Sequence, residues 1–154
     1  MKILMIGKKN SGKSTIAYNI FKNSDSCGIV CLPIFENGRK IGSDAIRMDD
    51  KSRVIFSRLK EIADFSGIEV GKYVISNEGI NFCIKAIEEG IEKGKLIVID
   101  EFGLLEKNKK GLYEAIKKAI ESKNDVFIII RKRLEKDFLK IFPYKFEKIY
   151  LKCS

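Results

Sequence analysis

The sequence has no histidine and no tryptophan, only two prolines, and four cysteines among its 154 residues. Without histidine, a zinc site would need all four thiolates, and no two cysteines have the C-x-x-C spacing of such sites. We therefore expect buried free thiols in a reducing, cytoplasmic environment. These thiols are Cys27, Cys31, Cys83 and Cys153.

Long hydrophobic runs are also missing. The longest one, residues 29–35, is far shorter than the roughly 20 residues of a membrane-spanning helix. The apolar N-terminal stretch meets Gly7 and two lysines too early for a secretory signal peptide. We expect no membrane attachment.

Basic residues outnumber acidic residues, and the excess is unevenly distributed along the chain. The net charge is +9, and residues 107–154 hold 14 basic against 6 acidic side chains. A solvated, lysine-rich face is the favoured interpretation. Attraction of a phosphate-rich partner such as nucleic acid is the less favoured one.

Short apolar runs alternate with amphipathic helical patterns along the chain. This alternation predicts an α/β fold with a mostly parallel sheet flanked by helices, formed by residues 1–154 as a single nucleotide-binding domain. Around the Asn37-Gly38 turn signal, residues 27–48 predict a β-hairpin that is an insertion or an antiparallel edge of that sheet. The other predicted strands cover residues 3–6, 53–58, 96–99, 126–130 and 149–151, and the predicted helices cover 14–22, 77–94, 112–120 and 134–142.

One motif carries a specific chemistry. Residues 7–14 read G-K-K-N-S-G-K-S and match the phosphate-binding P-loop, G-x-x-x-x-G-K-[ST], in full. A buried-type strand precedes the loop and a helix follows, which is the context that the motif requires. Lys13 is expected to act catalytically on the β- and γ-phosphates, and Ser14 to ligate Mg²⁺. The predicted nucleotide-binding residues are Gly7, Lys8, Lys9, Asn10, Ser11, Gly12, Lys13, Ser14 and Thr15.

A second signal is the apolar strand 96–99, which ends in two carboxylates. Beside a P-loop, Asp100 is expected to hold Mg²⁺ with Ser14, and Glu101 to orient or deprotonate water. No N-K-x-D segment for reading guanine follows, which argues against a GTPase. The predicted nucleotide-binding set therefore also includes Asp100, Glu101, Phe102 and Gly103.

With these motifs, the chain resembles the thermophilic-type nucleoside-triphosphatases, a small P-loop family that also includes the cancer-related nucleoside-triphosphatases. Residues 70–74 look like the family's V-G-x-Y stretch, and residues 100–106 look like its D-E-I-G-x-M-E segment. The resemblance implies a RecA-like fold and Mg²⁺-dependent hydrolysis of ATP, GTP and other nucleoside triphosphates with loose base selectivity.

The chain departs from the family at one cationic position. Where the family carries G-x-R-x-G-F, residues 38–43 place Lys40 in the arginine position. The candidates for a cation that contacts the γ-phosphate are therefore Arg39, Lys40 and Arg131. Glu106 is left with three interpretations: support for Glu101, binding of an acceptor, or a charge at a helix start.

Hydrolysis is the favoured function, and a kinase for a nucleotide or other small acceptor at the same site is the alternative. No long, arginine-rich lid that would exclude water is evident, which favours hydrolysis. The expected partners are nucleoside triphosphates, and the chain is expected to act as a monomer.

Overall fold

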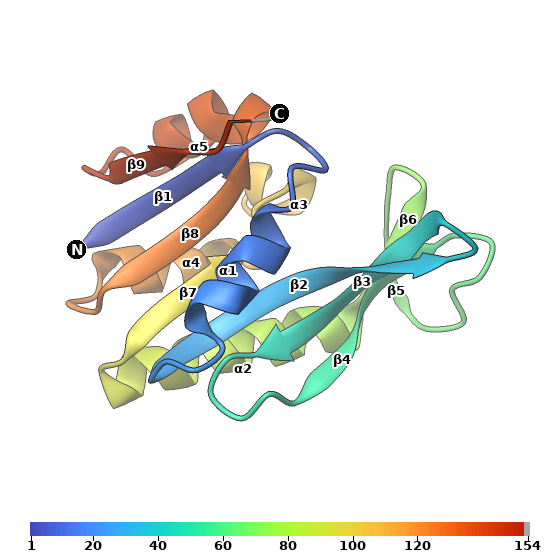
Figure 1. Cartoon of the computed structure of the whole chain (residues 1–154), viewed down its shortest axis with the longest axis horizontal. Coiled ribbons are helices and arrows are strands. Elements are labelled where there is room, and N and C mark those ends of the chain that lie inside the picture. The colour runs from blue at the N-terminus through green and yellow to red at the C-terminus, as the bar shows by residue number, and fades with distance from the viewer. Residues whose placement is uncertain (153–154) are drawn as a thin grey trace.

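The computed structural model describes residues 1–152, and its core is one nine-stranded sheet in the order β5-β6-β4-β3-β2-β7-β8-β1-β9 (Figure 1). Cys153, one of the predicted thiols, lies outside the described residues. The strands are β1 (Lys2–Gly7), β2 (Ser26–Glu36), β3 (Arg39–Arg47), β4 (Arg53–Leu59), β5 (Gly67–Val70), β6 (Tyr73–Ser76), β7 (Leu96–Asp100), β8 (Val126–Arg131) and β9 (Glu147–Tyr150). The helices are α1 (Lys13–Phe21), α2 (Asn77–Lys93), α3 (Leu104–Lys107), α4 (Tyr113–Glu121), the 3₁₀ turn η1 (Lys132–Leu134) and α5 (Glu135–Ile141).

Five strands form the parallel half of the sheet. In it, β1 pairs with β8 and β9, β8 with β7, and β7 with the first part of β2. Alternate residues of β1 face opposite sides, so that Leu4 and Ile6 pack toward α2 and α4, and Met5 packs with Ala17 of α1. Helices thus cover both faces, as the apolar runs predict, and the α/β fold with a mostly parallel core is confirmed.

The predicted hairpin is real but is one part of a larger antiparallel extension. Asn37 and Gly38 have φ of 53° and 76°, the left-handed geometry that a tight hairpin turn requires. β2 is shared by both halves of the sheet, because it pairs with β7 from Ser26 to Ile29 and with β3 from Ile29 to Glu36. Beyond β3 follow β4, β6 and β5, which Figure 1 shows projecting away from the parallel half.

Helix ends follow local sequence signals. The Ser76 hydroxyl accepts a hydrogen bond from the Gly79 amide at 3.0 Å and caps α2, which ends at Gly94 with φ of 66°. Within the described residues, no helix is long and apolar enough to cross a membrane. The three cysteines described, Cys27, Cys31 and Cys83, are buried free thiols, as predicted.

Candidate functional site

The parallel strands β1, β7 and β8 bring the predicted site residues to one edge of the sheet. β8 lies between the other two strands, and its last residue, Arg131, is in register with Gly7 at the end of β1. The P-loop and the acidic end of β7 are therefore one strand apart, with Arg131 between them. Binding sites in open α/β sheets form at this carboxyl edge.

The P-loop turns tightly into α1. Asn10 and Gly12 adopt left-handed φ values of 62° and 79°, and the Ser11 amide donates to the Lys8 carbonyl at 3.2 Å. Gly12 is the N-cap of α1 and offers no side-chain acceptor, and the first turn has no acidic residue. Because the first N–H groups of a helix lack intrahelical partners and carry partial positive charge, this end of α1 suits an anion.

Close packing inside the loop explains why position 7 is glycine. A Cβ at Gly7 would lie 2.8 Å from Ser11 Oγ and 3.1 Å from Lys13 Cδ. The Lys13 ammonium group donates to the Lys8 carbonyl at 2.9 Å, so its side chain lies along the loop. Ser11 Oγ is buried and has no hydrogen-bond partner within residues 1–152, which leaves its hydroxyl able to donate to a phosphate oxygen.

Asp100 joins the P-loop helix to the end of β7. Its carboxylate is 7% exposed, accepts the Cys31 amide at 3.0 Å, and accepts a hydrogen bond from the Ser14 hydroxyl. Burial raises the pKa of Asp100, against the effect of these two hydrogen bonds and of the Lys13 charge. A hydroxyl and a carboxylate side by side are oxygen ligands of the kind that Mg²⁺ takes in phosphate sites.

Glu101 follows in a setting that favours its neutral form. Burial raises the pKa of Glu101 to about 8, and the negative charges of Glu106 and Asp100 add to this effect. Arg131 and Lys40 act in the opposite direction. A carboxyl group with a pKa near neutrality is typical of catalytic acids and bases.

The structure shows that Glu106 acts as a clamp for the chain after Glu101. Its side chain is 3% exposed and accepts the Gly103 amide at 2.8 Å and the Leu112 amide at 2.9 Å. These bonds close residues 103–112 around α3. The carboxylate therefore satisfies the start of α3, as one interpretation from the sequence predicts, and its support of Glu101 and its binding of an acceptor stay predictions.

Phe102 belongs to the core at this point. Its ring is 4% exposed and packs edge-to-face on Phe138 and Phe142, at centroid distances of 5.0 and 6.2 Å. Its side chain therefore anchors the loop to α5 rather than facing the P-loop.

Two of the three predicted cations come together near Glu101. Lys40 is half-buried, and its pKa is lowered by burial and by Arg131 while Glu101 raises it. The Lys40 ammonium group also lies 5.9 Å from the centre of the Tyr73 ring, within cation–π range. Arg39 is instead exposed and paired with Glu61 at 2.6 Å.

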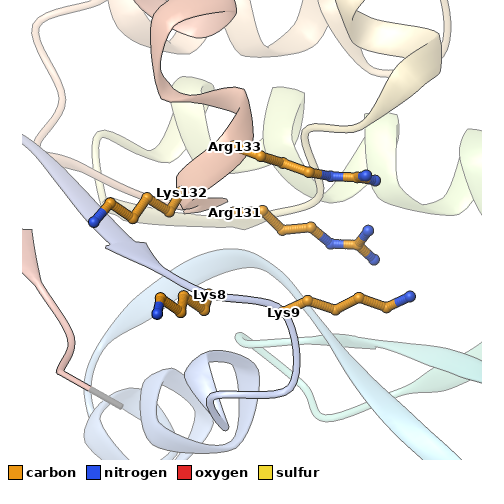
Figure 2. Close-up of a pocket in the computed structure, with 5 residues that line it drawn as sticks. All are labelled: Lys8, Lys9, Arg131, Lys132 and Arg133. Carbon is orange, nitrogen blue, oxygen red and sulfur yellow. The ribbon is translucent and has the colours of Figure 1, made fainter.

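A basic hollow of about 270 Å³ adjoins the P-loop. Figure 2 shows that Lys9, Arg131 and Arg133 point in one direction, and that Lys8 and Lys132 point in the other.

The hydrogen bond from the Cys31 amide to Asp100 is a contact of this site that the sequence analysis did not predict. No sequence signal could have found it, because it depends on the pairing of β2 with β7.

Comparisons with known proteins agree with this geometry. A family model described as NTPase matches residues 2–151. The nucleoside-triphosphatase THEP1 of Sulfurisphaera tokodaii is 28% identical over 153 residues, which are 96% of this chain and 87% of that protein.

Two solved structures share the fold. The crystal structure of THEP1 from Aquifex aeolicus covers 100% of this chain and 90% of its own, with a TM-score of 0.71 at 21% identity. The solution structure of a human cancer-related nucleoside triphosphatase covers 98% and 88%, with a TM-score of 0.70 at 17% identity. Both neighbours confirm the predicted P-loop architecture.

Proposed function

Because this chain belongs to the NTPase family, it hydrolyses nucleoside triphosphates, and we propose that it does so with Mg²⁺ at the P-loop site. The kinase alternative is not favoured, since the curated relatives are nucleoside-triphosphatases. The observation that supports this proposal best is the buried Asp100 carboxylate, which the Cys31 amide holds at 3.0 Å and whose pKa Ser14 and Lys13 of the P-loop helix lower. It joins the P-loop helix to the strand end that carries Glu101.

The P-loop holds the triphosphate in this proposal. Backbone amides of residues 7–15 and the positive end of α1 surround the phosphates. On binding, the Lys13 ammonium group moves from the Lys8 carbonyl to the β- and γ-phosphate oxygens, where its charge stabilises the transition state. The buried Ser11 hydroxyl supplies one further donor.

Ser14 and Asp100 would hold Mg²⁺. No group of three or more acidic or cysteine side chains that could hold a metal occurs within the described residues, which suits an ion that takes its other ligands from water and phosphate. When bound, the ion neutralises charge on the β- and γ-phosphates. The Cys31 amide holds Asp100 in place, because it donates to the same carboxylate.

In its ionised form, Glu101 orients the attacking water and accepts its proton. Arg131 and Lys40 lie near enough to influence the charge of Glu101, and we assign to them the cationic role toward the γ-phosphate. Arg39 is left outside the site, because it pairs with Glu61. Phosphate transfer to water then needs positioning, charge stabilisation and one proton acceptor from this chain.

The test is phosphate release from ATP, GTP, CTP and UTP, with Mg²⁺ and with a chelator in its place. We expect turnover of several nucleotides, its loss without Mg²⁺, and much weaker nucleotide binding in Lys13→Ala. Lys22→Ala, at the exposed end of α1, is the matched control. Mg²⁺-independent turnover, or Lys13→Ala with normal affinity, would contradict the assignment.

Three further statements remain sequence-based predictions within this proposal: a monomeric state, action in the cytoplasm, and loose base selectivity. Sedimentation analysis tests the first. The nucleotide panel above tests the last, because equal kcat/KM values across the four bases are what loose selectivity requires.

A further inference from the structure

The stretch of residues 70–74 is the sequence motif to which the P-loop site gives no role. It joins β5 to β6 through a tight turn, with Gly71 at φ of 58°, and places Tyr73 at the start of β6. Two ammonium groups lie within cation–π range of the Tyr73 ring centre, that of Lys40 at 5.9 Å and that of Lys72 at 5.7 Å. Lys72 is exposed, whereas Lys40 is half-buried and belongs to the proposed site. The contact with Lys40 therefore links the motif to the site.

The Lys40 ammonium group depends on this contact for its position. Within residues 1–152 it forms no hydrogen bond and no ion pair, whereas the adjacent Arg39 pairs with Glu61 at 2.6 Å. Arg131 and Lys9 lie near enough to lower the pKa of Lys40, after the larger effect of burial, and like charges repel each other. A lysine side chain has many rotamers, so without a contact the charge would spread over several positions.

An aromatic ring can hold a cation without cancelling its charge. A carboxylate partner would neutralise Lys40, as Glu61 does for Arg39, whereas the negative face of a ring attracts the ammonium group and leaves its full charge. That charge acts on Glu101, because Arg131 and Lys40 oppose the rise in the pKa of Glu101 that burial causes. The ring thus suits a lysine whose charge is needed at the site.

The paired strand β6 fixes the ring. Tyr73 pairs with Leu59 of β4 and with Val70 of β5, so its backbone is bonded on both sides. Because β4 lies between β6 and β3, the backbones of β6 and β3 are about 10 Å apart, and the side chains of Tyr73 and Lys40 meet across β4. A tyrosine side chain has only two χ angles to order, which makes its ring a firm support for the longer lysine.

We propose that Tyr73 is a positioning residue for hydrolysis, because its ring holds the Lys40 ammonium group beside Glu101. The β5–β6 hairpin then contributes to the active site through Lys40 and not by contact with the nucleotide. The inference rests on the proposed function, since Lys40 acts in catalysis only if the P-loop site hydrolyses the nucleotide.

The experiment is a double-mutant cycle on kcat/KM for ATP, with Tyr73→Leu, Lys40→Met and the double variant. Tyr73→Leu removes the ring and should lower kcat/KM about fivefold, the fold-change that one cation–π contact supports. Tyr73→Phe keeps the ring and should retain wild-type kcat/KM. In the Lys40→Met background, Tyr73→Leu should lower kcat/KM by less than about twofold, because the contact is already lost.

Two control variants accompany the cycle. Lys72→Met removes the exposed cation beside the same ring, and Tyr144→Leu removes an exposed ring between α5 and β9. Both side chains lie outside the proposed site, so kcat/KM should stay within about twofold of wild type in each variant.

NMR measures the contact without turnover. Protons close to the face of an aromatic ring resonate upfield, and the ε-methylene signal of Lys40 can be assigned by its absence in Lys40→Met. This signal should lie further upfield in wild type and Tyr73→Phe than in Tyr73→Leu. Wild type that does not hydrolyse ATP would refute the proposed function, and the Lys40 signal would still show whether the ring holds the lysine.

Three results overturn the inference. If the loss in Tyr73→Leu persists in full in the Lys40→Met background, the ring acts on the fold or directly on a nucleotide base. If Tyr73→Phe is impaired as strongly as Tyr73→Leu, the hydroxyl group and not the ring is what matters. If the Lys40 signal is the same in wild type and Tyr73→Leu, the ring does not hold the lysine.

Discussion

At the scale of single residues, the catalytic role that we propose for Glu101 gives the first prediction. Glu101→Gln keeps the shape and removes the base, so we expect kcat to fall roughly 10²–10⁴-fold with nucleotide affinity near that of wild type. Steady-state phosphate release and nucleotide titration measure the two quantities. Glu114→Gln is the matched control, because Glu114 lies on the exposed face of α4. Wild-type turnover in Glu101→Gln would remove Glu101 from the mechanism.

The same carboxyl group should make folding stability depend on pH. Burial, and then the charges of Glu106 and Asp100, raise the pKa of Glu101 to about 8 in the folded chain, above its ordinary value of 4.5. The folded state thus binds the proton more tightly than the unfolded state. The stability that the protonated group contributes is full below about pH 4.5 and is lost as pH rises through about 8.

The Glu101→Gln variant has no carboxyl group at this position, so it should not lose this stability as pH rises. Comparing the variant with wild type therefore measures the contribution of Glu101. In thermal melts without nucleotide or metal, the Tm of Glu101→Gln relative to wild type should rise between pH 5 and pH 8.5. A Tm difference that stays constant over this range would mean that burial leaves the affinity of Glu101 for its proton unchanged.

At the scale of elements, the loop after β7 depends on one buried carboxylate. Glu106→Ala leaves the Gly103 and Leu112 amides without their acceptor, and each loss costs about 1–3 kcal/mol of unfolding free energy. We expect urea denaturation to show a loss of about 2–4 kcal/mol, with Glu106→Gln losing less because its carbonyl oxygen can still accept. Glu114→Ala should change little. An unaltered midpoint in Glu106→Ala would refute the clamp.

Elements with strong periodicity could be predicted from the sequence. The apolar stripe of α2 indicates a helix with one buried face. The continuous apolar runs of β1, β7 and β8 indicate strands that are buried on both faces. The short elements could not be predicted. β5 and β6 have four residues each and are mostly exposed or half-buried, so they show no clear alternation. They depend on pairing, of β6 with β4 and of β5 with β6. α3, also of four residues, forms around the buried Glu106.

At the scale of the whole molecule, the strand order assembles the site. The P-loop and the Asp100-Glu101 pair could be predicted as components, because each has a local sequence signature. The identity of the cation could not be predicted, because Arg39 and Lys40 are adjacent and only the pairing of β3 sends their side chains to different places. Lys40 lies near Glu101 and the Tyr73 ring, whereas Arg39 meets Glu61 at the exposed tip.

Paired substitutions turn this difference into a prediction for the antiparallel extension. Lys40→Met keeps most of the apolar stem and removes a half-buried charge beside Glu101, so kcat/KM should fall about tenfold or more. Its pH–rate profile should also move to higher pH, because Lys40 opposes the rise in the pKa of Glu101. Arg39→Met removes an exposed ion pair worth about 0–1 kcal/mol, and turnover should stay within roughly twofold.

Initial rates of both variants across pH 6–9.5 show whether Lys40 or Arg39 acts in catalysis. If Arg39→Met impairs turnover as strongly as Lys40→Met, the hairpin must bring the other side chain to the nucleotide during catalysis. If only Lys40→Met is impaired and its profile is displaced, the antiparallel half of the sheet is part of the active site. The extension then serves to carry a cation from β3 to the carboxyl edge of the parallel strands.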